Sequence, residues 1–216
     1  EDATYLAAAE KGDTKTAQRL VDKAAKKAGY DWDGGRTFYH KTLKQFNVFK
    51  LGGFDPEISG HAIWFGYDSD PDKLAAFHNV GPAEGDFLRK PTTGIRVVGA
   101  KIRIDNPLYV DRFNNKEVNE RWGIDFRGLP WRLSALERDK LLAAGFDGIV
   151  YDSMQESADG SRTADEIAVL DPSQIKSADP ITRDDDGNVI PLSERFNPER
   201  DDIRFSVTPA QDATYL

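Results

Sequence analysis

Apolar residues near the start of the chain follow a helical spacing. They stand at i, i+3, i+4, i+7, i+8 and i+11, which marks one face of an amphipathic helix. These residues are Ala17, Leu20, Val21, Ala24, Ala25 and Ala28. Asp13 is suited to cap the start of this helix and Gly29 to end it. An alanine-rich stretch precedes Gly12, so residues 2–29 are predicted to form a helical hairpin that packs against another part of the chain.

The pattern changes between residues 32 and 179 to short apolar runs separated by Gly, Pro and Asp. Such runs are typical of a sheet with interspersed helices. Strands are predicted at 37–40, 62–67, 94–106, 148–151 and 166–170. Helices are predicted at 71–78 and 133–144, the second beginning at Ser134 and stopped by Gly145. Because most strands follow one another directly, an α+β fold is favoured over a doubly wound sheet.

The chain becomes acidic and polar after Pro180. Residues 184–188 lie between short apolar segments and contain Asp-Gly, which predicts a hairpin with a tight turn, and residues 197–216 are predicted to be extended. We therefore expect three parts. These are a helical hairpin at 1–30, a core at 31–182, and a hairpin with an extended tail at 183–216.

A short repeat and the first residue bear on the origin of the chain. The run Asp-Ala-Thr-Tyr-Leu occurs at 2–6 and again at 212–216, and the chain begins with Glu1. We interpret this as a piece of a longer multidomain polypeptide in which a second copy of the module begins near the end. A chance recurrence is the alternative.

Composition narrows the classes of function. The 216 residues include no cysteine, which excludes disulfides, thiol catalysis and Cys-ligated metals. Lys and Arg number 29 and Asp and Glu 37, a net charge of −8 that disfavours nonspecific binding to nucleic acid. No apolar run is long enough to cross a membrane, and no leader opens the chain. We expect a cytoplasmic protein, with delivery into a host cell as a further hypothesis.

Several familiar sites are not encoded. The chain lacks the glycine-rich dinucleotide and phosphate-loop motifs and the paired-histidine zinc motif. The acidic run at 184–188 resembles a calcium loop, but its glycine is misplaced and Arg195 stands where a glutamate is needed. Since His40, His61 and His78 are scattered, we expect no metal.

Three segments instead carry a resemblance to a known family. They are Phe-Tyr-His-Lys-Thr at 38–42, Gly-His-Ala-Ile-Trp-Phe at 60–65 followed by a predicted helix, and the strand that begins with Asp165-Glu166. Their order and spacing are similar to the ADP-ribosyltransferase domain of the polyvalent proteins of phages and mobile elements, in the diphtheria-toxin and poly(ADP-ribose)-polymerase branch. Residues 145–151, 197–198 and 202–206 also resemble that family. The resemblance covers residues 30–206 and implies a split two-sheet core whose cleft binds NAD as a substrate.

The resemblance also assigns roles to individual residues. His40 stands at the family's histidine and would hold a ribose hydroxyl of NAD, with Lys41 and Thr42 beside the nicotinamide amide. Glu166 stands at the catalytic glutamate, which is expected to stabilise the positive charge that develops when the nicotinamide–ribose bond breaks. Lys41 replaces the usual glycine, and Ala164 stands where arginine-modifying branches carry Gln or Glu. Arginine is therefore not favoured as the acceptor.

Aromatic residues would form the walls of the nicotinamide pocket. Trp64 takes the place of the family's tyrosine, and Tyr67 and Phe77 are the other candidates. A flat ring without a hydroxyl can still hold nicotinamide. Without the resemblance, Trp64, Phe65 and Phe77 would be interpreted as core residues, His40 as an ordinary strand-end residue and Glu166 as an edge-strand residue.

The expected activity is transfer of ADP-ribose from NAD to a macromolecular acceptor, a protein rather than a nucleic acid, with inversion at the anomeric carbon. Three alternatives stay open. A NAD glycohydrolase would use the same residues with water as acceptor. A degenerate NAD-binding or interaction module is favoured by Lys41 and Trp64. Residues 2–29 and the tail could instead be docking elements of a scaffold.

Overall fold

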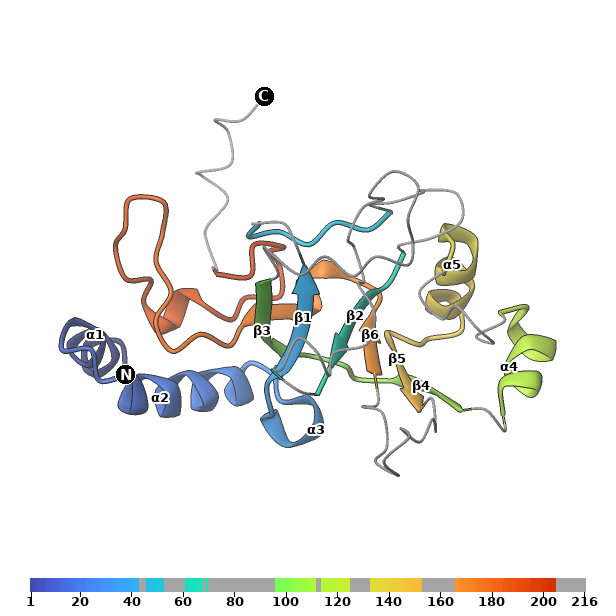
Figure 1. Cartoon of the computed structure of the whole chain (residues 1–216), viewed down its shortest axis with the longest axis horizontal. Helices are drawn as coiled ribbons and strands as arrows, with labels where there is room; N and C mark the ends of the chain where they lie inside the picture. Colours follow the sequence, from blue (N-terminus) through green and yellow to red (C-terminus); the bar gives the residue numbers. More distant parts are fainter. Residues whose placement is uncertain are drawn as a thin grey trace.

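The computed structural model is described here for the residues that are placed well enough to interpret. These are residues 1–42, 46–52, 61–67, 69, 96–111, 114–124, 133–152 and 166–204. The predicted helix at 71–78, and Phe77 with it, lies outside the described residues. The fold is mixed α+β. Figure 1 shows the sheet in the middle of an elongated molecule, with α1 and α2 at one end and α4 and α5 at the other.

Helices and strands do not follow one another in a regular order along the described chain. The helices are α1 (Asp2–Glu10), α2 (Thr14–Lys27), α3 (Trp32–Gly35), α4 (Asn115–Trp122) and α5 (Ala135–Ala143), with 3-10 turns η1 (Pro172–Gln174) and η2 (Leu192–Glu194). The strands are β1 (Phe38–Thr42), β2 (Ile63–Gly66), β3 (Arg96–Ile102), β4 (Pro107–Asp111), β5 (Gly148–Asp152), β6 (Glu166–Val169) and β7 (Ile175–Ser177). The helical hairpin and the strands near 38, 63, 148 and 166 are confirmed.

The predicted caps of two helices are also confirmed. The Asp13 carboxylate accepts the Thr16 N–H at 3.0 Å at the start of α2. Ser134 forms a reciprocal capping box with Glu137 at the start of α5, the pattern in which each residue's side chain bonds the other's backbone N–H. Gly145, with φ of 88°, follows the end of α5. These local signals were sufficient to place both helices.

The strand predicted at 94–106 is wrong in its second half. β3 ends at Ile102, and a separate strand, β4, begins at Pro107. The chain turns between them because the Asp147 carboxylate accepts the backbone N–H groups of Asp105 and Asn106, each at 2.8 Å. This long-range contact satisfies donors that a continuing strand would have used in pairing.

The seven strands found in the described residues belong to one mixed sheet in the order β4-β5-β6-β2-β1-β3-β7. The β4–β5 pair is parallel and the other pairs are antiparallel. Where the resemblance implies two sheets, the structure therefore has a continuous one. However, β1 and β2 are paired only at Tyr39 and Gly66. The sheet consequently consists of a Glu166 half (β4, β5, β6 and β2) and a His40 half (β1, β3 and β7) that meet at one residue pair.

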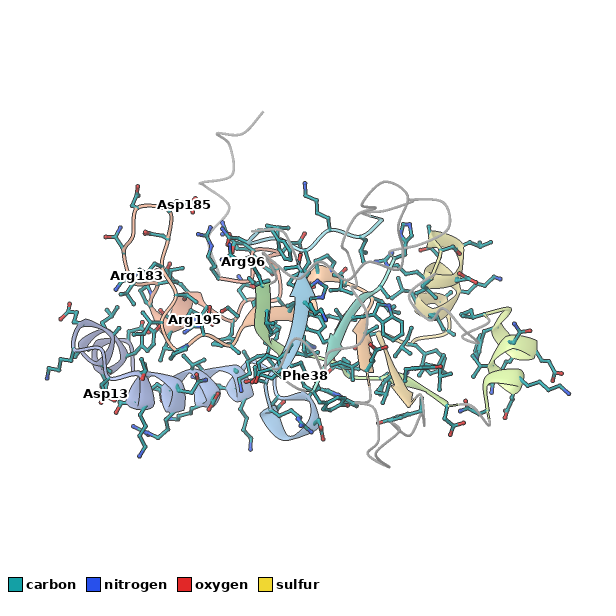
Figure 2. The ribbon with its side chains drawn as sticks, in the orientation of Figure 1. Asp13, Phe38, Arg96, Arg183, Asp185 and Arg195 are labelled. Atoms are coloured by element: carbon teal, nitrogen blue, oxygen red, sulfur yellow. The ribbon has the colours of Figure 1, made fainter. Side chains whose placement is uncertain are left out.

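The helical hairpin packs against the segment that follows β7. Tyr5, Leu20, Val21, Leu192 and Phe196 share one apolar cluster, so residues 1–30 and 183–196 pack on each other. The Arg195 guanidinium lies inside this region, between the hairpin and the sheet (Figure 2). It donates to the Tyr5 hydroxyl at 3.1 Å and to the backbone carbonyl of Asp179 at 2.6 Å.

The last described residues turn back onto the sheet. The tight turn at Asp184–Asn188 forms as predicted, with Gly187 at φ of 85° and an antiparallel bridge between Arg183 and Val189. The predicted extended tail starts differently, because Ile203 is buried in the apolar cluster of β1, β2 and β3. Residues from 205 onward lie outside the described part.

Candidate functional site

Glu166 occupies a defined place in the sheet, at the start of β6. It pairs with Gly66 of β2 on one side and with Tyr151 of β5 on the other. Gly66 pairs in turn with Tyr39, so Tyr39, Gly66, Glu166 and Tyr151 form one row across the junction of the two halves. Paired residues project to the same face of a sheet. Because Gly66 has no side chain, the sheet position next to Glu166 on the β2 side carries none.

Trp64 lies on the same face as Glu166. It precedes Gly66 by two residues in β2, and its indole is buried in the apolar cluster with Ala168 and Ile149. The Trp64 and Tyr151 rings are perpendicular, with centroids 6.4 Å apart. The structure therefore brings together a buried carboxylate and an aromatic ring, with Tyr151 beside both.

His40 spans the junction between β1 and β2. Its Nδ1 lies 2.8 Å from the backbone carbonyl oxygen of Trp64. A carbonyl oxygen only accepts, so we assign a proton to Nδ1. The imidazole is 1% exposed.

Phenylalanine rings surround the His40 imidazole. The ring centroids of Phe49 and Phe65 lie 5.0 Å and 5.5 Å from it, and that of Phe46 lies at 6.4 Å. Phe65 belongs to the opposite face of β2 from Trp64. His40 is therefore linked to Trp64 through the backbone carbonyl, and its ring packs on the other face.

Lys41 and Thr42 complete β1 and are both buried. They pair with Val97 and Arg96 of β3. Lys41 is 8% exposed and Thr42 1%. The lysine that replaces the family's glycine is thus accommodated inside the protein.

Tyr67 does not join Trp64 and Glu166. Its ring packs edge-on against Phe38 at 5.1 Å, and the Arg36 guanidinium stacks over it at 4.5 Å. This cluster lies at the start of β1, on the Phe38 and Phe65 side of the sheet. In the described structure Tyr67 is a neighbour of the α3–β1 connection. Phe77, the remaining candidate wall, lies outside the described residues.

Gly66 and Tyr151 were missed as site residues by the sequence analysis. Both flank Glu166 only because of the strand register. The local signals were weak: Gly66 directly follows an aromatic pair, and Tyr151 alternates with Ile149 in a short apolar run. Neither signal identifies the partner strand, which depends on pairing between distant segments.

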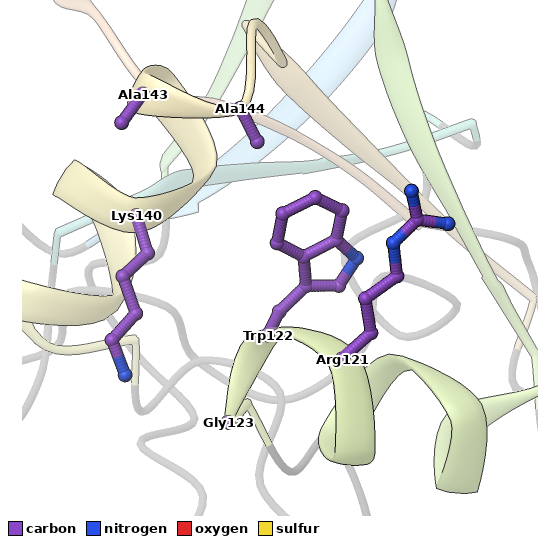
Figure 3. Close-up of a pocket in the computed structure, with 6 residues that line it drawn as sticks. All are labelled: Arg121, Trp122, Gly123, Lys140, Ala143 and Ala144. Atoms are coloured by element: carbon purple, nitrogen blue, oxygen red, sulfur yellow. The ribbon is translucent and has the colours of Figure 1, made fainter.

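A pocket between α4 and α5 is separate from these residues (Figure 3). Its volume is about 540 Å³, and it is lined by Arg121, Trp122, Gly123, Lys140, Ala143 and Ala144. The Arg121 guanidinium stacks on Trp122 at 4.9 Å. Arg121 and Lys140 lie in the last turns of their helices, where positive charges offset the helix dipoles. We therefore interpret these two cations as structural.

Two searches of the described structure gave negative results. Within the ranges given above, no group of three or more His, Asp or Glu side chains could hold a metal ion. No helix among the same residues is long and apolar enough to span a membrane.

Comparisons of the chain with models of known protein families, with curated proteins and with solved structures found no match.

Proposed function

We propose that this chain transfers ADP-ribose from NAD to a macromolecular acceptor and releases nicotinamide. One observation carries the proposal. The buried Glu166 carboxylate stands beside the side-chain-free position of Gly66, on the same face as Trp64, and His40, whose ring lies on the opposite face, bonds the Trp64 carbonyl from the neighbouring strand β1. The resemblance of the sequence assigns Glu166, Trp64 and His40 to the family's functional positions.

The chemistry follows from the charges that such a site offers. Nicotinamide leaves with the electron pair of its bond to C1′ of the ribose, which leaves an oxocarbenium-like sugar. The Glu166 carboxylate stabilises this positive charge and accepts a hydrogen bond from the ribose 2′-hydroxyl. The acceptor nucleophile attacks C1′ from the opposite side and loses its proton to solvent or to a base, with inversion.

The other residues orient NAD. His40, held through Nδ1 by the Trp64 carbonyl, is the proposed partner of a ribose hydroxyl, which requires NAD to reach the buried imidazole between the surrounding phenylalanine rings. Thr42 and the backbone of Lys41 hold the nicotinamide amide, and the Trp64 indole forms one wall of its pocket. Tyr67 and Phe77 are weaker candidates for the second wall, since Tyr67 packs with Arg36 and Phe38.

A protein is the proposed acceptor. The net charge of −8 disfavours a polyanionic substrate. A glycohydrolase that uses water is the second candidate, and the same residues would serve it. A non-catalytic NAD-binding module is the third, and the observation in its favour is the buried Lys41 in place of glycine.

The test uses NAD labelled in its adenylate part, incubated with the full chain in the presence and absence of bacterial lysate. A transferase releases nicotinamide and puts protease-sensitive label on macromolecules, and both signals are lost in Glu166→Gln. Glu199→Gln is the matched control, because Glu199 is an exposed glutamate. Release without labelled macromolecules would identify a glycohydrolase. Thermal stabilisation by NAD without release would identify a binding module and would refute the enzymatic proposal.

A further inference from the structure

Residues 200–204, the return segment, lie between β7 and the chain that follows β1. The Ser177 N–H donates to the Ile203 carbonyl at 2.8 Å, and the Ile203 N–H donates to the Asn47 carbonyl at 2.9 Å. Val48 and Asp202 form an antiparallel bridge. The return segment is thus bonded on one side to the sheet and on the other to residues 47–48.

Buried groups hold the return segment in place. The Ile203 side chain packs in the same apolar cluster as Phe49 and Phe65. The Lys176 ammonium, which is fully buried, donates to the Arg200 carbonyl at 2.6 Å and lies 3.4 Å from that of Asp202. The position of the segment is therefore fixed by the core and by a buried charge.

Arg204 connects three parts of the chain. Its Nη2 lies 3.0 Å from Asp202 Oδ2, and its Nη1 lies 2.7 Å from Oδ1 of Asp185, which is at the tip of the 184–188 turn (Figure 2). With the Asn47 amide oriented so that its oxygen faces the guanidinium, that oxygen accepts from Nη2 at 3.1 Å. The Arg204 side chain is 17% exposed, so these charge-assisted bonds are partly shielded from water.

The residues on either side of Asn47 and Val48 contact His40. Asn47 and Val48, which the return segment bonds, directly precede Phe49, whose ring stands perpendicular to the imidazole with centroids 5.0 Å apart. Phe46, on the other side of Asn47, also meets the imidazole edge-on. Phe46 and Phe49 belong to no described helix or strand. The contacts of residues 47–48 therefore act together with the packing of Phe49 on Phe65 to fix these rings against His40.

We propose that Arg204 is a positioning residue for His40. It locks the return segment against residues 47–48 and so fixes the Phe46 and Phe49 rings around the imidazole. This inference rests on the proposed function, in which the orientation of His40 sets the affinity for NAD. Loss of Arg204 then weakens NAD binding and leaves the bond-breaking step at Glu166 largely intact.

The test first measures the NMR signals of the His40 imidazole and then the kinetics of the reaction. In the ¹⁵N-labelled full chain the imidazole signals of the three histidines are assigned with His61→Gln and His78→Gln. The wild-type His40 signals should show one neutral Nδ1–H form. Arg204→Gln should shift or multiply them, and Arg204→Lys should restore them in part, because lysine keeps the charge but cannot bond three acceptors in a fixed plane. Arg183→Gln is the control, since Arg183 is exposed and its side chain donates to Gly187.

Steady-state kinetics distinguish a positioning role of Arg204 from a general effect on stability. Arg204→Gln should raise the KM for NAD by about three- to tenfold and change kcat less than about twofold. If this variant does not fold, Asp185→Asn removes one partner of Arg204 and should give a smaller change of the same kind. Unchanged His40 signals in a folded Arg204 variant would overturn the inference. If the wild-type chain releases no nicotinamide, the proposed function fails, but the imidazole signals still decide the role of Arg204.

Discussion

The two halves of the sheet use buried polar side chains very differently. Among the side chains described in the strands of the Glu166 half, Glu166 is the only buried charged one. The strands of the His40 half bury many polar or charged residues: His40, Lys41, Thr42, Lys101, Lys176 and Ser177. The Lys101 ammonium, for example, donates to the Gly35 carbonyl at 2.6 Å and pairs with Asp22 at 2.9 Å.

This difference distinguishes charges that hold the fold together from the carboxylate of the proposed site. In the His40 half, buried charges tie the helices and the return segment to the sheet. In the Glu166 half, a carboxylate is placed in an apolar strand, where the burial of its charge has to be compensated. Glu166 is therefore the buried charge of this half that the proposed function uses.

The largest effect on stability is expected at Arg195, where the hairpin and the His40 half meet. Arg195→Ala should lower the free energy of unfolding by about 3–5 kcal/mol, because it leaves one buried and one partly buried carbonyl group without their donor. Those carbonyls include Ser177 at 3.2 Å and Asp179 at 2.6 Å. Urea denaturation measures the change. Arg183→Ala, at an exposed arginine, should cost little; equal losses in the two variants would contradict a structural role for buried Arg195.

A second effect should depend on pH. Burial lowers the pKa of Lys176 to about 8, against the opposing influence of Asp202 and Asp201. The unfolded chain keeps this proton up to the usual lysine pKa of about 10.5, so the unfolded state binds more protons between these values. The free energy of unfolding should therefore rise with pH across this window, by up to about 3 kcal/mol.

The Lys176→Met variant isolates that contribution. Its free energy of unfolding should be flatter than that of the wild type between pH 8 and 10.5, the interval between the folded and unfolded pKa values. The measurement is urea denaturation of both proteins at several pH values. Identical pH profiles would show that Lys176 is not a buried charge in the folded state.

Alanine substitutions at two strand glycines compare how tightly the two halves are packed. A Cβ at Gly148 in the Glu166 half would lie 2.9 Å from Ile104 Cγ2 and 3.1 Å from the Ala168 backbone oxygen. Gly148→Ala should therefore destabilise by about 1–3 kcal/mol. A Cβ at Gly99 in the His40 half meets the Thr37 methyl group at 3.3 Å, so Gly99→Ala should cost less than about 1 kcal/mol. Thermal denaturation should rank the two variants in this order, and the reverse order would contradict the tighter packing of the Glu166 half.

Small effects are also expected at the caps of two helices, α5 and α2. Ser134→Ala should lose the capping box of α5, and Asp13→Ala the cap of α2. Each should destabilise by about 1 kcal/mol. Neither residue lies near Glu166 or His40 in the sheet, so nicotinamide release should persist in both variants. A selective loss of release in Ser134→Ala would show that α5 acts on the site.

The sequence predicted what local chemistry determines. The caps at Asp13 and Ser134, the turn at Gly187 and the central strands follow from short-range patterns. The end of β3 could not be predicted, because it depends on the Asp147 carboxylate more than forty residues away. Strand β4 (Pro107–Asp111) was not predicted, because the strand expected before it ended at residue 106 and no strand was expected again before residue 148.

The candidate site can be compared in the same way. His40, Trp64 and Glu166 were predicted from motif order; the structure links His40 to the Trp64 carbonyl and places Trp64 on the face of Glu166, with the His40 ring on the opposite face. Gly66 and Tyr151 required the strand register. The contact between the return segment and residues 47–48 joins positions about 155 apart in the chain, which no local pattern encodes.

The most direct test of the central claim compares Glu166→Gln with the wild type in two measurements. Nicotinamide release is followed at saturating NAD, and NAD binding is followed by calorimetry, with Glu199→Gln as the control. The account predicts that release by Glu166→Gln falls about 100- to 1000-fold, while the dissociation constant for NAD changes only a few-fold. Release at the wild-type rate by the folded Glu166→Gln variant would contradict the claim that this carboxylate stabilises the transition state.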